Sequence, residues 1–273
     1  MTRNSTNGAP DNEGGTVTRA HSRDFNQSLG RGLGIIETFG PDSARQTVSE
    51  VASKTGLTRA TARRFLITLV ELGYMTSDGR TFSLAPRVLG LGYSFLSGLG
   101  FPNVALPHLE LLVAEVDESS EASILDGEDV VYVTRVPGTK LMTIAVNIGS
   151  RMPAHATSMG RVLLAGLPDE EFESYLASAS LKRFQPATVT DGEALRERVT
   201  RARADGYAIV NQELEEGLLA VAVPIHDRFG RTIAAINLST LVTRHTPRSV
   251  RSDLLPPLQR CARMIERDLS NVV

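Results

Sequence analysis

Two short helices joined by a tight turn are predicted for the stretch TVSEVASKTGLTRATARRFLITLVELGYM, which runs from Thr47 to Met75. Thr47 and Glu50 form a Thr-x-x-Glu capping box, in which each side chain bonds a backbone N–H at the helix start. Gly56 predicts the end of that helix because glycine adopts positive φ without strain. Thr58 then caps a second helix. This stretch limits the possible folds more than any other part of the sequence.

The second predicted helix has an apolar face and a basic face. Ala62, Phe65, Leu66 and Leu69 recur at three- and four-residue spacing, so we expect them to be buried together. The other face carries, near the start of the helix, Thr58, Arg59, Ala60, Thr61, Arg63 and Arg64. This layout is typical of a helix-turn-helix whose second helix enters the major groove of DNA. The plainer alternative is a basic face that is only solvated.

A β-hairpin, or wing, is predicted directly after the second helix, in MTSDGRTFSL. Asp78-Gly79 is a tight-turn dipeptide between two short strand-like runs. Arg80 lies beside that turn, where a wing can contact a phosphate. The order of helices and wing strengthens the prediction of DNA binding.

An amphipathic helix is predicted before the helix-turn-helix. Leu33, Ile36 and Phe39 mark its apolar face, and Gly40-Pro41 ends it. Arg31 lies at its start and could reach a phosphate or the minor groove. We therefore include Arg31 among the candidate DNA-binding residues.

The distribution of charge agrees with this prediction, although the net charge of the chain is only −2. Residues 26–90 hold eight Lys/Arg against five Asp/Glu, a net charge of +3. Residues 91–273 hold eighteen against twenty-three, a net charge of −5. A basic front end on an acidic body directs the favourable potential for DNA to one surface.

Several other classes of protein are disfavoured by composition. Cys261 is the single cysteine, so a disulfide framework or cysteine-based zinc site is not expected. The histidines lack metal-ligand spacing, and no phosphate-binding loop is evident, so we predict neither a metal nor a cofactor. No apolar run reaches the ~18 residues of a membrane span. Residues 1–25 are predicted to be a disordered tail rather than a signal peptide, which indicates a cytoplasmic protein.

The segment from Ala85 to about Glu118 is predicted to be helical, with a break at Gly100-Phe101-Pro102. Its first part, PRVLGLGYSFLSG, has more apolar surface than a solvated linker needs. We expect self-association into a homodimer, and further into a homotetramer, because symmetric operators require paired recognition helices. The alternative is that this helix packs only on its own two domains.

Beyond Ser119 the pattern predicts an α+β sensor-like domain. Strand-like runs cover residues 121–126, 129–136, 141–148, 207–210, 218–225 and 232–239. Helices are predicted to begin near Thr157, Asp169 and Asp191, and a final helix runs from Pro247 to Leu269. Hairpin-length gaps such as Gly127-Glu128-Asp129 indicate largely antiparallel pairing.

A small ligand is expected beside the helix that begins at Thr157 or Ser158, in IGSRMPAHATSMGRVLLAGL. The unpaired N–H groups at a helix start suit a carboxylate, and both hydroxyls can add hydrogen bonds. Asn237 and Ser239 alternate with apolar neighbours in a strand, so they share one face. Buried polar side chains need partners, and a bound acid is one possibility. The alternative is that both bond to backbone at a strand end.

The sequence gives little support for a catalytic site. His155 lies near Ser158, but there is no Gly-x-Ser-x-Gly elbow and no evident acid partner. We therefore predict no catalytic residues, and His155 is interpreted as a structural or ligand-lining side chain.

The chain resembles the IclR family of transcriptional regulators from about Ser28 to Leu269. The matching blocks are GLTRATARRFLITLVELGYM, IGSRMPAHATSMGRVLLA, GYAIVNQELEEGLLAVAVPI and IAAINLS. Within the family it is most similar to regulators of protocatechuate and 4-hydroxybenzoate catabolism, on the β-ketoadipate pathway. The resemblance implies a disordered tail (1–25), a winged helix-turn-helix domain (26–85), a linker and dimerisation helix (86–103) and a GAF-like effector domain (104–273).

The resemblance also implies which residues line the effector pocket: Leu141, Ile144, Ser158, Met159, Val210, Leu218, Ala220, Asn237 and Ser239. Val210 and Ala220 depart from more polar family residues, which disfavours a two- or three-carbon acid. A larger, flatter ligand is implied, either an aromatic acid such as protocatechuate or 4-hydroxybenzoate, or a C6 dicarboxylate such as β-ketoadipate. Regulation of another carboxylic-acid operon is the alternative, and an enzyme with a DNA-binding head is a weaker one.

Overall fold

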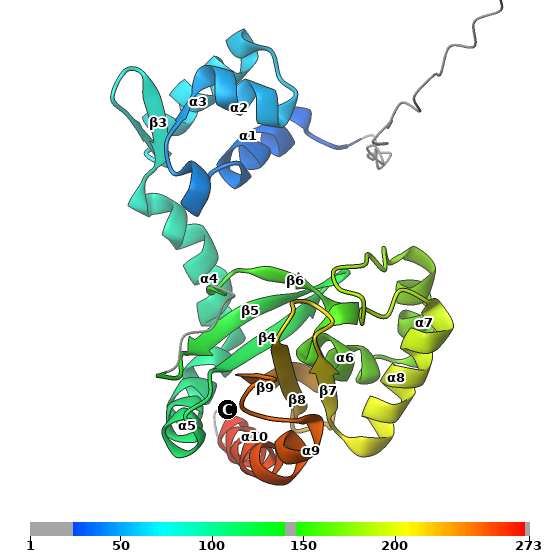
Figure 1. The fold of residues 1–273 in the computed structure, drawn as a ribbon. Helices are drawn as coiled ribbons and strands as arrows, with labels where there is room; N and C mark the ends of the chain where they lie inside the picture. The colour runs from blue at the N-terminus through cyan, green and yellow to red at the C-terminus, as the bar shows by residue number, and fades with distance from the viewer. Residues whose placement is uncertain (1–23, 140–145, 271–273) are drawn as a thin grey trace, which may run out of the picture. The chain divides into compact units, whose positions relative to one another are not determined.

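The computed structural model describes residues 24–139 and 146–270 of the chain. It divides between Tyr93 and Ser94 into two compact units (Figure 1). Almost all of the predicted disordered tail lies outside the described residues.

The first unit is a winged helix-turn-helix. Its elements are α1 (Gln27–Glu37), a 3₁₀ turn (Pro41–Ser43), β1 (Gln46–Thr47), α2 (Val48–Thr55), α3 (Arg59–Glu71), β2 (Met75–Ser77) and β3 (Thr81–Leu84). The three strands form an antiparallel sheet in the order β1-β3-β2. The predicted helix-turn-helix and wing are both confirmed.

The local signals of the turn are confirmed as well. The N–H of Thr47 donates to Glu50 Oε2 at 2.6 Å, and the N–H of Glu50 donates to Thr47 Oγ1. Gly56 ends α2 with φ of 66°, the left-handed conformation that favours glycine. Thr58 caps α3 by accepting the N–H of Thr61. Gly56 thus ends α2 and Thr58 starts α3, which defines the tight turn between the two helices.

The apolar face of α1 differs from the prediction. Ile35 is fully buried and Phe39 nearly so, whereas Leu33 is exposed. Asn26 caps α1 through its Oδ1, and the buried stripe then falls on Ile35, Ile36 and Phe39 at one- and four-residue spacing. Leu33 lies beyond the edge of that stripe because each helical residue advances by about 100°. The predicted burial of Leu33 was wrong.

Helix α4 (Leu89–Leu99) is followed by α5 (Phe101–Val116), and the break between them falls at Gly100, with φ of 63°, as predicted. Leu89, Tyr93 and Phe95 on α4 are exposed by half or more of their surface. This part of the chain thus presents large apolar side chains to solvent.

The second unit is built on one antiparallel sheet of six strands, which confirms the α+β class. The strands are β4 (Ser120–Asp126), β5 (Asp129–Val136), β6 (Arg151–Pro153), β7 (Ala208–Asn211), β8 (Leu218–His226) and β9 (Thr232–Leu241), in the order β6-β5-β4-β9-β8-β7. Residues 141–145 of the predicted strand 141–148 lie outside the described residues. The short edge strand β6, which ends in a proline, was missed.

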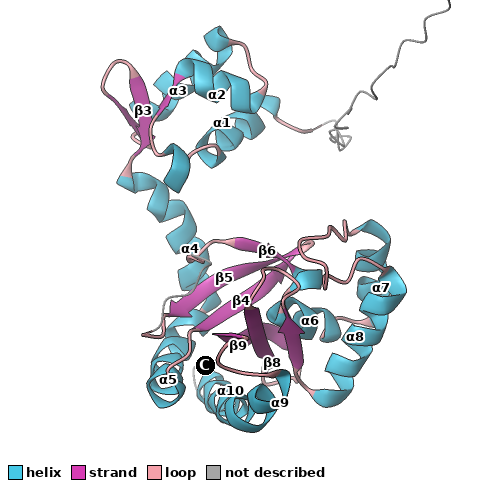
Figure 2. Ribbon diagram, in the orientation of Figure 1, coloured by secondary structure: helices cyan, strands magenta, loops and turns pink. Residues whose placement is uncertain are grey.

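Helices cover both faces of this sheet (Figure 2). On one face lie α5 and α10 (Leu255–Leu269), packed on Leu219, Val221 and Ile236. On the other lie α6 (Ser158–Ala165), α7 (Asp169–Ser178) and α8 (Gly192–Asp205). The predicted final helix is present as α9 (Pro247–Ser249), a π turn (Val250–Leu254) and α10.

Helix α6 packs unusually closely on the 3₁₀ turn that precedes it, Ala154–Ala156. A Cβ added at Gly160 would lie 2.1 Å from the carbonyl oxygen of Ala154, so only glycine fits there. The two backbones therefore touch directly, and the start of α6 is held against the turn.

None of the helices in the described part of the chain is long and apolar enough to cross a membrane.

Candidate DNA-binding face and effector site

The basic face of α3 is open to solvent. Arg59, Ala60, Arg63 and Arg64 are exposed, and Thr61 is half-buried beside its cap Thr58. Within the described residues, no ion pair involves the guanidinium of any of the three α3 arginines. Ala62, Leu66 and Leu69 hold the opposite face in the core, with Phe65 packed against it, as predicted. The side chains needed to contact a nucleic acid are thus all available.

Arg31 and Arg64 lie at one surface hollow of the first unit. Its lining comprises Ser28, Arg31, Thr61, Arg64, Phe65 and Thr68, so the starts of α1 and α3 share this surface. Arg31 also donates to Gln27 Oε1 at 3.3 Å. Arg80 belongs to the wing turn, where its N–H donates to Asp78 Oδ1. Backbone hydrogen bonds from Arg80 and Thr81 lower the pKa of Asp78 to about 2, so the turn keeps its charge and shape.

In the second unit, the sheet face that packs on α6 brings several predicted effector residues into one row. Val210 pairs with Ala220, and Ala220 pairs with Ser239, across β7, β8 and β9. Directly paired residues point to the same side of a sheet, so these three side chains lie next to one another. Asn237 and Leu218 lie on this face too, each two residues from a member of the row.

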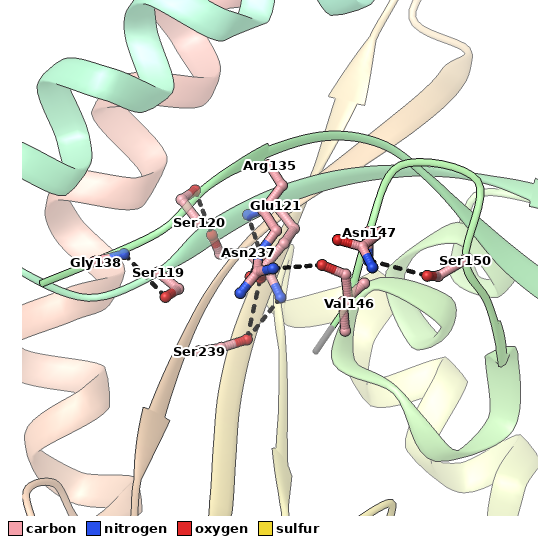
Figure 3. A network of polar contacts seen from close by, with 10 residues as sticks. All are labelled: Ser119, Ser120, Glu121, Arg135, Gly138, Val146, Asn147, Ser150, Asn237 and Ser239. Atoms are coloured by element: carbon pink, nitrogen blue, oxygen red, sulfur yellow. Dashed lines mark hydrogen bonds and ion pairs between the residues drawn. The ribbon is translucent and has the colours of Figure 1, made fainter. Parts of the chain in front are cut away.

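The polar side chains on this face form a connected group (Figure 3). Asn237 Nδ2 donates to Ser239 Oγ at 3.0 Å, and Ser239 Oγ donates to Glu121 Oε2 at 3.3 Å. The N–H of Glu121 donates to Asn237 Oδ1 at 2.8 Å. All three residues are buried. The alternative that Asn237 and Ser239 bond to backbone therefore holds only for the amide oxygen of Asn237, and it lies in mid-strand.

Arg135 and Glu121 are the charged members of this group. Glu121 is 4% exposed, and burial raises the pKa of its carboxyl against the lowering effects of Asn237, Arg135 and Ser239. Arg135 Nε lies 3.9 Å from Glu121 Oε1, while Arg135 Nη1 donates to the carbonyl of Val146 at 2.5 Å. Arg135 Nε itself has no hydrogen-bond partner among the described residues. This guanidinium therefore has a donor left for an added acceptor.

The start of α6 lies over the same face. Thr157 caps the helix by accepting the N–H of Gly160 at 3.1 Å, and Ser158 and Met159 are almost fully buried. Met159 Sδ accepts the hydroxyl of Ser123 on β4 at 3.2 Å, which links the helix to the sheet. The N–H groups in the first turn of a helix have no carbonyl within the helix to bond.

Most predicted effector residues are thus brought together by β7, β8, β9 and the start of α6. Leu141 and Ile144 lie outside the described residues. Glu121, Ser123 and Arg135 were missed by the sequence reasoning. A signal for Glu121 and Arg135 was present, because EASILD and DVVYVTRV carry charged side chains within largely apolar strand-like runs.

His155 serves the structure of this unit. Its Nε2 lies 3.0 Å from the carbonyl oxygen of Lys182, and burial lowers its pKa. Its ring also lies 5.9 Å from that of Phe184. Within the described residues, no group of three or more His, Cys, Asp or Glu side chains could hold a metal ion.

Comparison with known proteins identifies both units. Residues 28–79 match the model of the IclR helix-turn-helix domain, and residues 94–267 match that of the bacterial transcriptional regulator IclR C-terminal domain. The chain belongs to the IclR family. The winged helix-turn-helix of this IclR protein is therefore a DNA-binding domain, and its second unit is the C-terminal domain of the family.

Curated IclR relatives are similar along most of the chain. The Pca regulon regulatory protein of Pseudomonas putida is 40% identical over 88% of this chain and 83% of its own length. The p-hydroxybenzoate hydroxylase transcriptional activator of Acinetobacter baylyi is 36% identical over 92% of this chain and 93% of its own length.

Solved IclR structures share the fold. A protein from Rhodococcus sp. RHA1, described as a candidate transcriptional regulator, is 51% identical, with a TM-score of 0.81 over 91% of this chain and 100% of its own. An IclR homolog from Microbacterium hydrocarbonoxydans, solved in complex with 4-hydroxybenzoate, is 30% identical, with a TM-score of 0.78 over 89% of this chain and 98% of its own.

Proposed function

We propose that this IclR protein is a cytoplasmic regulator of aromatic-acid catabolism that binds an operator through α3 and the wing and responds to a small carboxylic acid. The observation that supports the response is a connected polar group on a largely apolar sheet face, in which Glu121, Asn237 and Ser239 are buried and Arg135 is half-buried. Glu121, Asn237 and Ser239 bond to one another, which leaves the Nε of Arg135 as the donor without a partner among the described residues. The relatives that act on pca and p-hydroxybenzoate genes support the same effector class.

The chemistry of the effector site suits a hydroxylated aromatic acid. The free Nε donor of Arg135 is available to a carboxylate, and charge-assisted hydrogen bonds of this kind are the strong ones. A protonated Glu121 can donate to, and accept from, a ring hydroxyl, which its raised pKa favours. Val210 and Ala220 contribute apolar surface without further polar groups, which matches a flat ring.

Effector binding is tested by calorimetry with 4-hydroxybenzoate, protocatechuate and adipate, the last as a plain C6 dicarboxylate. We expect one of the two hydroxybenzoates to bind, and Ser158→Ala and Ser239→Ala to weaken that binding by about tenfold, the usual effect of one hydrogen bond to a charged group. Ser178→Ala, at the exposed end of α7, is the matched control. Unchanged affinity in both site variants would remove this face from effector binding, and tighter binding of adipate would select the dicarboxylate.

Operator binding requires two recognition helices, and we propose a homodimer, assembled further into a tetramer, as their source. Half-sites would lie about 10–10.5 base pairs apart, or a multiple of that. The exposed apolar side chains of α4 support self-association through this helix. Light scattering on Leu91→Glu/Tyr93→Glu tests it: we expect a smaller assembly and loss of operator binding. An unchanged mass would place the interface elsewhere.

The effector acts by its differential affinity for two arrangements of the DNA-binding domains, typically ~1–3 kcal/mol. We assign no catalytic step to this chain, since His155 is engaged with the Lys182 carbonyl. Incubation of the purified protein with protocatechuate is expected to return the compound unchanged; turnover would support the enzyme alternative.

A further inference from the structure

A small surface cavity of about 130 Å³ lies between α8, β7 and the π turn of the second unit. Its lining comprises Arg161, Arg198, Arg201, Ala202, Asp205, Tyr207, Ala208, Ile209 and Arg251. Four of these nine side chains are arginines, and one is an acid. The residues of the candidate effector site do not take part in this lining, so the two sites are separate.

Arg161, in the lining of this cavity, is an arginine buried to 97% of its surface. Its Nη2 donates to Glu213 Oε2 at 2.5 Å, but its Nε has no hydrogen-bond partner among the described residues. An unpartnered buried donor on a guanidinium is costly, because the donor has lost its water. Because Arg161 is part of the cavity lining, an acceptor bound in the cavity is the candidate partner of this guanidinium.

Helix α8 divides its arginines between pairing and the cavity. Arg196 is paired with Glu173, and Arg203 is paired with Asp169 at 2.7 Å. Arg198 and Arg201, one turn apart, line the cavity instead and make no ion pair among the described residues. Asp205 lies one turn beyond Arg201, yet no ion pair joins them. The same helix thus holds neutralised arginines on one side and free ones at the cavity.

The fourth guanidinium comes from a distant part of the sequence. Arg251, in the π turn, lies over the ring of Tyr207 at 5.8 Å, which holds its charge at the cavity rim. If the Arg161–Glu213 pair is taken as neutral, three arginines and Asp205 leave the cavity with a net charge of about +2. Like charges gathered at one point repel each other unless an anion joins them.

The geometry points to a binding site for a doubly charged tetrahedral oxyanion, a phosphate or the phosphoryl group of a small metabolite, at Arg161, Arg198, Arg201 and Arg251. A guanidinium fork matches phosphate oxygens in bidentate fashion, and several forks around one centre can engage the oxygens of a tetrahedral group. The volume of about 130 Å³ suits an anion of a few heavy atoms. The site is independent of the proposed effector function.

The position of the site links it to the effector helix. Arg161 belongs to α6, whose first turn lies at the candidate effector site. Ile209 precedes Val210 on β7, so the cavity and the effector row share a strand. An anion here would hold α6 and β7 from the side opposite the effector.

The test is the thermal stability and calorimetry of the full chain with inorganic phosphate, glycerol 3-phosphate and malonate, at constant ionic strength in chloride. We expect phosphate or its ester to raise the melting temperature, and Arg198→Gln/Arg201→Gln to weaken binding by tenfold or more. Arg196→Gln/Arg203→Gln is the matched control on the same helix, because those arginines are already paired. This control is expected to retain wild-type affinity.

The outcomes of these measurements decide whether the cavity binds an anion and of which class. Tighter binding of inorganic phosphate identifies a free-phosphate site, and tighter binding of glycerol 3-phosphate identifies a site for phosphorylated metabolites. Malonate binding as well as either overturns the tetrahedral class. No binding, or an equal loss in the two double variants, overturns the site itself, and this result leaves effector binding at Ser158 and Ser239 unaffected. Arg251→Gln changes an exposed residue of the cavity lining, so little risk to folding is expected. This variant should also bind phosphate more weakly than the wild type.

Discussion

The two units of this chain use arginine in opposite ways. On α3 of the first unit, Arg59, Arg63 and Arg64 are exposed without an ion pair among the described residues. In the second unit several arginines meet a carboxylate, as Arg161 meets Glu213 and Arg203 meets Asp169. The difference separates guanidinium groups that stabilise the fold from those kept for a polyanion outside it.

Arginines of the second unit that lack a carboxylate partner among the described residues are therefore candidates for anion binding. Arg198, Arg201 and Arg251 make no ion pair among the described residues, and they meet at one cavity. Arg135 is an intermediate case, 3.9 Å from Glu121 and with a free donor. Arginines with donors left unpartnered among the described residues thus mark three places for an anion: the DNA face, the effector site and the cavity beside α8.

The largest expected effect comes from breaking the buried pair. Glu213→Ala leaves Arg161 as an unpaired charge inside the protein, which lowers the free energy of unfolding by about 3–5 kcal/mol. Chemical denaturation measures this loss. Arg161→Met/Glu213→Leu is the control, since replacing both charges by apolar groups restores much of the stability. A loss below about 1 kcal/mol for Glu213→Ala would show that Arg161 is not a structural arginine.

On α3 the same kind of change affects binding rather than folding. Arg63→Ala or Arg64→Ala weakens operator binding by about 1–3 kcal/mol and leaves the melting temperature nearly unchanged, because both side chains are exposed and make no ion pair with the described residues. Fluorescence anisotropy against salt separates the roles: a base contact relaxes preference at one base pair, whereas a phosphate contact flattens the salt slope by about one. Arg203→Ala should bind the operator as wild type does. If both α3 variants bind as tightly as wild type, the assignment of this helix is wrong.

The pH dependence of stability tests the pair formed by Arg135 and Glu121 in the effector site. Burial raises its pKa above the ordinary 4.5 of an unfolded chain, so its contribution to stability is fully present below about that pH. That contribution is lost as the pH rises through the raised pKa. Glu121→Gln removes the titration, so the melting temperature of this variant should improve relative to wild type between pH 4.5 and pH 8. A constant difference over this range would mean that Glu121 stays ionised when folded.

The smallest effect is expected at the surface. Glu173→Ala removes the partner of Arg196 on the exposed side of α8, and exposed pairs are screened by water and salt. We expect no measurable change in melting temperature at 0.15 M salt. A clear loss of stability would weaken the distinction between paired and free arginines on this helix.

The fold was largely predictable because its signals are local. The capping box at Thr47, the turn at Gly56 and the hairpin at Asp78-Gly79 each act within a few residues, and all three are present in the structure. The strands of the second unit were found by their apolar patterns. The failure at Leu33 came from the choice of helix face, which is set by packing of Ile35, Ile36 and Phe39 on the rest of the core and not by apolar spacing alone.

Only part of the effector site could be predicted from the sequence, because residues that contact one another there are far apart along the chain. Asn237 and Ser239 were singled out as polar residues in a buried strand, but their partner Glu121 is more than a hundred residues away. Pairing of β4 with β9 brings them together, and the sequence carries no local sign of it. The arginines of the cavity beside α8 also come from three separate elements.

The close packing of Gly160 on Ala154 couples helix α6 to the 3₁₀ turn that precedes it. No side chain lies between these backbones to absorb a displacement, so a ligand that pushes on the first turn of α6 also moves the preceding turn. That turn contains His155, whose Nε2 lies 3.0 Å from the carbonyl oxygen of Lys182, 27 residues further along the chain. Direct contacts therefore connect the first turn of α6 to the loop that holds Lys182.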